Sequence, residues 1–261
     1  MRTAAEYRRL AKNAMSGKYA DLVGANLVGG LIISGIFMAF LAFLFAAVFA
    51  LNFMTDAGAE TLVLVLLVLA MTVVLVGMAL LSMVLNGGIV RLIRCACRGE
   101  GTKLGELFYG FQSGLAGRLI GISILTGLIA LPFALPYWVW NIAESLLWIT
   151  SVQSIGAVVF LKLISFLLLV WYMAGFIGIG LYFGLSFYIL VDRPQLGAVE
   201  CMKESLRLTK GRRKELFFLW LSYAGYYILG LMSAGIGFLW IMPNIQCALY
   251  YFYWDLRAEK G

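Results

Sequence analysis

Six apolar stretches, most of them longer than a lipid bilayer requires, run through this sequence of 261 residues. They cover residues 22–53, 62–93, 119–140, 158–191, 216–234 and 238–254. A helix needs about 20 mainly apolar residues to cross the hydrocarbon core of a bilayer. Because a helix bonds its own backbone N–H and C=O groups, it is the form in which such a stretch enters a membrane. The sequence therefore predicts an all-α polytopic membrane protein with six transmembrane helices.

The few charged residues predict the topology of these helices. Charged residues make up 13% of the chain and hydrophobic residues 63%, which leaves too few charges to cover a water-soluble fold. Of the 20 lysines and arginines, all except Lys162 lie before the first stretch, around the connection from the second to the third, between the fourth and fifth, or after the sixth. Since basic residues concentrate on the cytoplasmic side of a membrane, we expect both termini in the cytoplasm.

Prolines and glycines predict interruptions of the helices. Pro132 and Pro136 lie within the third stretch, and a proline inside a helix removes a backbone hydrogen bond. We expect this helix to kink or stop near them. Gly235 and Gly237 separate the fifth stretch from the sixth and favour a tight turn between two short helices.

Short amphipathic segments precede the first, third and fifth stretches. Apolar residues recur with helical spacing at Tyr7, Leu10, Ala11 and Ala14, at Leu104, Leu107, Phe108 and Phe111, and in another register at Val199, Met202 and Leu206. Each segment is followed by a glycine, and these glycines are 97 residues apart: Gly17, Gly114 and Gly211. We interpret the chain as one membrane domain, 1–261, with three hairpins, each preceded by a cytoplasmic amphipathic helix. The candidate repeats are 1–100, 101–195 and 196–261; unrelated loops that happen to match are the alternative.

Cationic side chains of these segments are candidate lipid-surface anchors. The set comprises Arg8, Arg9, Lys12, Lys103, Lys203, Arg207, Arg212 and Arg213. Cations beside a membrane are attracted to anionic headgroups, so they either recognise lipids or simply anchor the topology. We therefore expect membrane lipids, anionic ones among them, as partners. The composition excludes a nucleic-acid-binding domain and leaves protein partners and homo-oligomers open.

Polar residues inside the apolar stretches are candidates for a solute or headgroup site. Lys162 is the one basic residue outside the cytoplasmic set, and a charge within a membrane is costly enough to suggest a function. Three alternatives are open for Lys162: its ammonium group binds an anionic headgroup, it pairs with Glu144, or the side chain extends to the membrane surface. The amides of Asn86, Asn244 and Gln246 either bond neighbouring helices or line a solute pathway.

Residue types that many enzymes require are missing. The sequence contains no His, which excludes Ser-His-Asp triads and His-ligated metals. It contains no Walker, GxSxG or HExxH motif, and a pair of Ser165 with Lys162 is the remaining catalytic alternative. Redox or zinc spacing is absent from the four cysteines, which are Cys95, Cys97, Cys201 and Cys247. We expect no enzyme activity, no catalytic residues, no metal and no cofactor.

The carboxyl-terminal third carries a family resemblance. It contains LSFYILVDRPQLGAVECMKESLRLTKGRRKELFFLWLSYAGYYILG and then GIGFLWIMPNIQCALYYFYWDL. The features that match are Asp192, Pro194, Glu200, Ser205, Gly211, Leu221, Ser222, Gly235, Gly237, Pro243, Phe252 and Tyr253. With them the chain resembles the bacterial integral-membrane family catalogued as domain of unknown function 975, although Tyr226 and Asn244 stand where that family usually has Trp and Tyr. The resemblance implies a six-helix protein of the bacterial cytoplasmic (inner) membrane and brings no catalytic residues.

Two functions fit these features. The first is a non-enzymatic membrane protein that binds or moves a lipid, a peptide or another amphipathic solute. It rests on the hairpin plan, the intramembrane amides and Lys162. The alternative is a structural or accessory subunit, or an immunity factor against a membrane-active peptide, because the sequence shows so little site chemistry. We expect the first.

Overall fold

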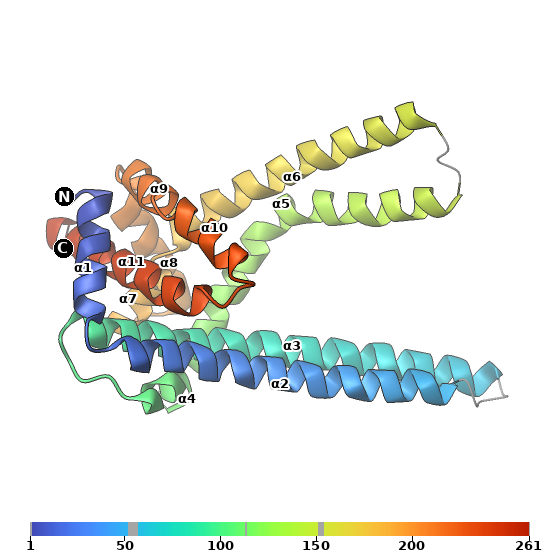
Figure 1. Cartoon of the computed structure of the whole chain (residues 1–261), viewed down its shortest axis with the longest axis horizontal. Helices are drawn as coiled ribbons and strands as arrows, with labels where there is room; N and C mark the ends of the chain where they lie inside the picture. Colours follow the sequence, from blue (N-terminus) through green and yellow to red (C-terminus); the bar gives the residue numbers. More distant parts are fainter. Residues whose placement is uncertain (1, 52–56, 113, 151–153, 261) are drawn as a thin grey trace. The chain divides into compact units, whose positions relative to one another are not determined.

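The computed structural model describes residues 2–51, 57–112, 114–150 and 154–260, which form helices and no strand (Figure 1). Five segments are long and apolar enough to cross a membrane: Tyr19–Phe49, Thr61–Cys97, Ala116–Leu147, Ile155–Asp192 and Arg213–Met232. The prediction of an all-α protein with membrane-spanning helices is therefore confirmed. The chain divides into two compact units, which are described separately: Met1–Ile120 with Ser222–Asp255, and Gly121–Leu221 with Leu256–Gly261.

The sixth predicted stretch is not among these five segments. It forms the first part of α11 (Phe238–Lys260), where Pro243, Asn244 and Gln246 interrupt the apolar sequence. Several large side chains of α11, including Tyr250 and Phe252, are buried inside unit 1 instead of facing outward. Of the six predicted transmembrane helices, five therefore correspond to segments that are long and apolar enough to cross a membrane.

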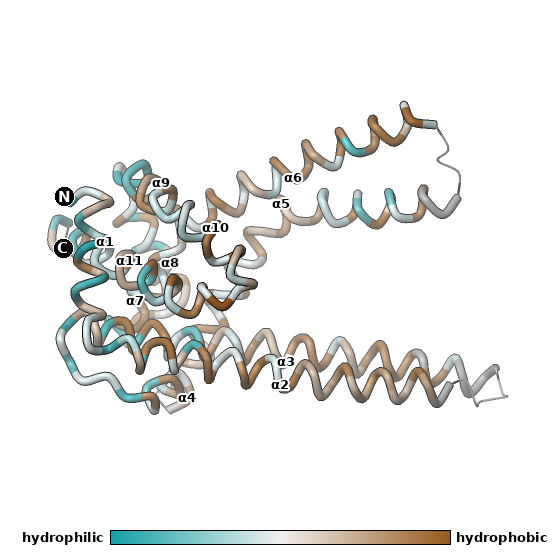
Figure 2. The backbone as a smooth tube through the Cα atoms, in the orientation of Figure 1, coloured by the Kyte–Doolittle hydropathy of each residue, from teal (hydrophilic) through white to brown (hydrophobic). Residues whose placement is uncertain are grey.

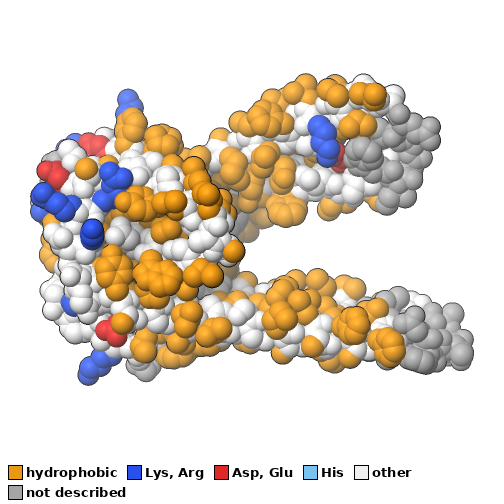
Figure 3. Space-filling view, in the orientation of Figure 1, with side chains coloured by type: hydrophobic (Ala, Val, Ile, Leu, Met, Phe, Trp, Pro, Cys, Tyr) orange, Lys and Arg blue, Asp and Glu red, His pale blue; other side chains and the backbone are white. Residues whose placement is uncertain are grey.

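Unit 1 is built on a long helical hairpin. The helices α2 (Tyr19–Leu51) and α3 (Ala57–Cys97) pack side by side, and hydrophobic residues extend along both (Figures 1 and 2). Many of their apolar side chains are exposed, as a lipid-facing helix requires. Figure 3 shows hydrophobic side chains over the surface of this hairpin.

The amino-terminal amphipathic helix is confirmed as α1 (Ala4–Met15). Thr3 and Glu6 form a capping box that satisfies backbone N–H groups at its start. The backbone N–H of Thr3 donates to the Glu6 carboxylate, and this bond is the main reason that the pKa of Glu6 lies below its ordinary value. Tyr7 and Ala11 are buried as their spacing predicts, and α1 packs against α3.

The second amphipathic segment differs from the prediction of an α-helix. Residues Leu104–Phe108 form the 3-10 helix η1, followed by the one-turn helix α4 (Tyr109–Gln112). Only Leu107 of the four predicted apolar positions is buried, and its backbone lies directly on α3. A Cβ atom at Gly88 would come within 1.8 Å of the Leu107 carbonyl oxygen. This close backbone approach, which only glycine allows, favours the tighter 3-10 turn over an amphipathic α-helix.

Unit 2 contains a second hairpin, formed by α5 (Ala116–Thr150), which enters this unit at Gly121, and α6 (Ile155–Phe183). Of the two predicted alternatives, a kink or a stop near the prolines, the stop is excluded, because α5 continues through Pro132 and Pro136 to Thr150. Figure 1 shows α5 bending along its length, as a proline-containing helix does. The two helices pack through aromatic rings, with Tyr137 stacked on Tyr172 at a centroid distance of 5.6 Å.

Shorter helices complete both units. In unit 2, α6 is followed by α7 (Ser186–Asp192), α8 (Ala198–Thr209) and α9 (Arg213–Leu221). The amphipathic helix α8 is confirmed, but Val199 is 51% exposed, and its buried face carries Met202 with Cys201 and Leu208 instead. In unit 1, α10 (Ala224–Met232) and α11 are joined by the predicted tight turn, in which Gly235 has a φ of 87°.

The three glycines that are 97 residues apart share one backbone conformation. Gly17, Gly114 and Gly211 have φ values of 79°, 65° and 83°, in the left-handed region that residues with a Cβ atom rarely adopt. Each amphipathic segment therefore ends in the same kind of turn. The division into three repeats stays a prediction.

Candidate functional site

A pocket of about 690 Å³ lies in unit 1 between α1 and the carboxyl-terminal helices. It is lined by Arg8, Arg9, Lys12, Tyr19, Tyr223, Tyr226, Trp240, Ile241 and Asn244. The amphipathic pattern of α1 explains the cationic wall. Tyr7 and Ala11 face the protein interior, so the cations next to them in the sequence lie along the edge of that buried face.

Contacts between α1 and α11 hold this wall in place. The Tyr7 hydroxyl donates to the Asp255 carboxylate at 2.8 Å, and the Arg2 guanidinium pairs with the same carboxylate at 2.8 Å. Burial, together with the bond to Asp255, raises the pKa of Tyr7 above its ordinary value. The Tyr7 and Phe252 rings also meet edge to face. The cations of α1 are therefore carried on a helix that is fixed by packing, which is what a preorganised site requires.

Hydrogen bonds arrange the polar groups of the pocket. The Arg8 guanidinium donates to the Ser222 carbonyl at 2.9 Å. The Tyr223 hydroxyl donates to the Asn244 side-chain oxygen at 2.7 Å, which leaves the amide NH₂ of Asn244 as a donor. Three cations line the pocket, and none of the lining residues is acidic. Cations and N–H donors next to aromatic and aliphatic walls suit an anion that carries an apolar part.

A second polar cluster joins the helices of the hairpin in unit 2. The Lys162 ammonium contacts the Glu144 carboxylate at 2.6 Å, and the Ser165 hydroxyl donates to the other oxygen of that carboxylate at 2.6 Å. The Trp140 indole N–H donates to Ser165 at 2.8 Å. Glu144 is only 4% exposed, whereas the Lys162 side chain is 61% exposed. The predicted pairing of Lys162 with Glu144 is thus present.

This cluster does not activate Ser165 in the way the catalytic alternative requires. The hydroxyl proton of Ser165 points to Glu144 and the oxygen accepts from Trp140, while Lys162 bonds Glu144 and not Ser165. A nucleophilic serine needs its base within hydrogen-bond reach and an open position for a substrate. The arrangement is a network of hydrogen bonds and one ion pair around the buried Glu144 carboxylate.

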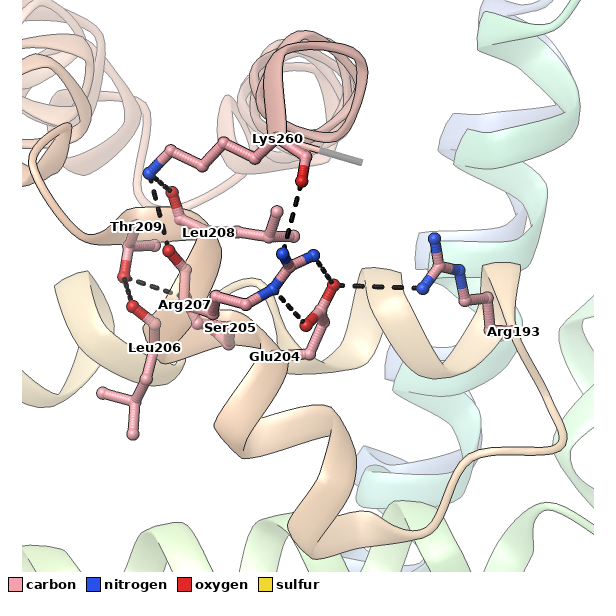
Figure 4. A network of polar contacts seen from close by, with 8 residues as sticks. All are labelled: Arg193, Glu204, Ser205, Leu206, Arg207, Leu208, Thr209 and Lys260. Atoms are coloured by element: carbon pink, nitrogen blue, oxygen red, sulfur yellow. Dashed lines mark hydrogen bonds and ion pairs between the residues drawn. The ribbon is translucent and has the colours of Figure 1, made fainter.

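A third charged cluster joins α8 to the end of α11 (Figure 4). Arg207 donates twice to the Glu204 carboxylate, at 2.8 Å each, and the Lys260 ammonium donates to the carbonyls of Leu208 and Lys210 at the end of α8. The bidentate bond from Arg207 is the main reason that the pKa of Glu204 lies below its ordinary value. These cations satisfy carboxylates and helix carbonyls of the chain itself.

The comparison with protein families decides the identity of the chain. The family model described as "Protein of unknown function (DUF975)" matches residues 1–260. The chain belongs to the DUF975 family. The resemblance found in the sequence is therefore confirmed over almost the whole DUF975 chain. No curated protein and no solved structure matches it.

The predicted site residues of this DUF975 protein are divided between the two units. Of the five, Asn244 lines the pocket of unit 1, and Lys162 and Glu144 form the ion pair of unit 2. Asn86 is exposed on α3, and Gln246 is half-buried in α11. Within the described residues, no group of three or more His, Cys, Asp or Glu side chains is placed to hold a metal ion.

The predicted surface anchors fall into two groups. Arg8, Arg9 and Lys12 line the pocket, and Lys103 and Lys203 are exposed on the surface. The others make contacts inside unit 2, where Arg207 pairs with Glu204, Arg212 pairs with Glu215 and Glu259, and Arg213 lies 3.8 Å above the ring of Tyr182. Carboxylates of the chain itself therefore engage Arg207 and Arg212 of this set.

Sequence reasoning missed the aromatic wall of the pocket. This wall consists of Tyr19, Tyr223, Tyr226 and Trp240, which come from three separate places in the chain. One signal was present, since the resemblance to the DUF975 family marks Tyr226 and Asn244 as expected departures from that family's pattern. Both departures line the pocket.

Proposed function

We propose that this chain is a non-enzymatic integral membrane protein that binds an anionic amphiphile, a lipid with a phosphate headgroup, in the pocket of unit 1. The observation that carries the proposal is the composition of the pocket wall. Arg8, Arg9 and Lys12 supply positive charge, and no carboxylate among the lining residues neutralises it. A phosphate group satisfies several such donors at once.

The apolar part of the pocket supports a lipid over a free anion. Trp240 and Tyr226 are half-exposed, and Ile241 lies beside them. Aromatic side chains with one polar end favour the boundary between headgroups and acyl chains. A ligand with its phosphate at α1 and its chain along α10 and α11 would contact both kinds of wall.

The proposal includes a topology in which the pocket faces the cytoplasmic headgroups. We propose six spans in the bacterial cytoplasmic membrane, with both termini in the cytoplasm and α1 along the membrane surface. The distribution of lysines and arginines supports this orientation. It brings Arg9 and Lys12 to the depth of lipid phosphates, where cations attract anionic lipids.

Photolabelling of the full chain tests the proposal. The chain is reconstituted in phosphatidylcholine vesicles with a phosphatidylglycerol probe that carries a diazirine in its acyl chain, and labelled peptides are mapped. We expect the label near Tyr226 and Trp240. In the double variant Arg9→Gln, Lys12→Gln, the amount of label at these positions should fall about tenfold or more. The matched control is Lys103→Gln, Lys203→Gln, which removes two exposed cations outside the pocket.

The controls define the results that would refute the site. Equal labelling of the pocket variant and the wild type would show that Arg9 and Lys12 do not bind the headgroup. Equal loss in the control variant would show a general effect of surface charge. Equal labelling by a phosphatidylcholine probe would remove the requirement for an anionic headgroup.

A further inference from the structure

A second pocket, of about 510 Å³, lies in unit 2 and shares no residue with the first. It is lined by Leu181 of α6 and by Arg213, Lys214, Phe217 and Phe218 of α9. We propose that this pocket is a separate binding site for an anionic phospholipid of the surrounding bilayer, with the phosphate on Arg213 and Lys214 and an acyl chain against the three apolar side chains.

Arg213 is held in place without using its full set of donors. Its guanidinium group lies 3.8 Å from the centre of the Tyr182 ring, a cation–π contact that fixes the plane of the group. Its Nε atom is buried and has no hydrogen-bond partner among the described residues. A phosphate oxygen is an acceptor that matches a guanidinium group.

The neighbouring Arg212 shows why the charge of Arg213 and Lys214 is available. The Arg212 guanidinium pairs with Glu215 at 2.7 Å and with Glu259 at 2.5 Å. Arg212 is therefore engaged by two carboxylates of the chain. None of the residues that line the pocket is acidic. The wall therefore keeps a net positive charge, which complements a phosphate.

The helical spacing of α9 aligns the charges with an apolar surface. Phe217 follows Arg213 by four residues, and Phe218 follows Lys214 by four, so each cation has a phenyl ring one turn farther along the same face. Phe218 is 60% exposed, which is unusual for a ring that faces water and ordinary for one that faces lipid. A phospholipid has the same order of groups, with the phosphate first and the acyl chain after it.

Close packing between α6 and α9 keeps the two walls together. A Cβ atom at Gly180 would come within 2.3 Å of the Trp220 ring, so glycine at this position allows the ring to lie against α6. Leu181, the next residue, forms the α6 wall of the pocket. The site is therefore built on two packed helices instead of a loop.

Native mass spectrometry of the purified full chain tests this site. The probes are phosphatidylglycerol and phosphatidylcholine with the same acyl chains. We expect the wild type to keep phosphatidylglycerol, and the double variant Arg213→Gln, Lys214→Gln to lose about tenfold in affinity for it. Lys203→Gln, Lys210→Gln is the charge-matched control, because it removes two exposed cations of the same unit outside the pocket.

Further variants separate this site from misfolding and from the pocket of unit 1. Phe218→Ser keeps both cations and should weaken binding of the long-chain probe more than that of a short-chain phosphatidylglycerol. The double variant Arg9→Gln, Lys12→Gln should leave the Arg213-dependent binding unchanged. The proposals for the two pockets can therefore be refuted independently of each other. Equal binding of phosphatidylcholine, equal loss in the control, or an unchanged affinity in Arg213→Gln, Lys214→Gln would each overturn the proposal. The proposal would also be overturned by an amphipathic peptide that displaces the lipid from the pocket and with which added phosphatidylglycerol does not compete.

Discussion

The cations of α1 and those around α8 are similar in number and differ in what surrounds them. Arg8, Arg9 and Lys12 line a pocket without an acidic residue. Arg207 and Lys260 bond a carboxylate and helix carbonyls of the same unit (Figure 4). The α1 cations and Arg207 belong to segments with similar sequence patterns, both amphipathic helices with basic residues, whereas Lys260 lies at the end of α11.

The difference teaches that a cation's partners, and not its place in an amphipathic helix, determine its role. A guanidinium group that already holds a carboxylate in two hydrogen bonds has little left to offer a ligand. The α8 cations therefore stabilise the fold, and the α1 cations are available for an anion. This distinction can be tested by giving the first group a partner or by taking partners away from the second.

The largest effect is expected when the pocket receives an internal carboxylate. Lys12→Glu places an acid four residues after Arg8 and three after Arg9, which is the spacing of ion pairs on a helix. The substitution removes one cation and engages the other two, so we expect binding of phosphatidylglycerol to weaken about 100-fold. Photolabelling of the pocket measures the change.

A charge reversal outside the pocket provides the control for this result. Lys203→Glu changes the net charge by the same amount on the exposed face of α8. It should leave labelling of the pocket within about twofold of the wild type, because Lys203 is not among the residues that line the pocket. Equal weakening by both reversals would mean that net charge governs binding, and the distinction between the two groups would fail.

A smaller effect is expected when the pair of buried Glu144 with exposed Lys162 loses its acid. Glu144→Leu removes the acceptor of Lys162 and one of the two acceptors of Ser165, which should cost about 1–3 kcal/mol of stability. Thermal unfolding in detergent measures the loss. The double variant Glu144→Leu, Lys162→Leu should recover most of it, since a hydrophobic pair often replaces a buried ion pair without cost. A double variant as unstable as Glu144→Leu alone would show that the ion pair is not what Glu144 contributes.

Much of the fold follows from hydrophobic patterning alone. The long hairpins, α1, α8 and the turn at Gly235 were predictable, because apolar periodicity and glycine act locally. The 3-10 helix η1 was not, since it depends on the contact of Leu107 with Gly88 on another helix. The prolines in α5 left a kink or a stop open, and the sequence alone does not decide between them, since α5 also packs on α6 through Tyr137 and Tyr172.

The candidate site was predictable only in part. The cations of α1 and Asn244 stood out as polar residues in or beside apolar stretches. The aromatic residues that complete the pocket did not, because tyrosine and tryptophan are frequent in this chain and no spacing connects Tyr19 with Trp240. The sequence also does not show which cations have partners, since Glu259 reaches Arg212 across 47 residues.

The smallest effect is expected at the exposed pair of α8, and it should depend on pH. The pKa of Glu204 is below its ordinary value of 4.5, mainly because Arg207 donates to the carboxylate. A carboxyl whose pKa is lower in the folded state contributes stability that is complete above its unfolded pKa and is lost as the pH falls through the folded pKa. Exposed pairs contribute little, so Glu204→Gln should lower the melting temperature at pH 7 by about 2 °C or less.

The difference in melting temperature between the Glu204→Gln variant and the wild type should shrink as the pH is lowered below about 4.5. A difference that stays constant from pH 7 to pH 3 would show that the charge of Glu204 does not act through Arg207, and the α8 cations would then not be held as their contacts indicate.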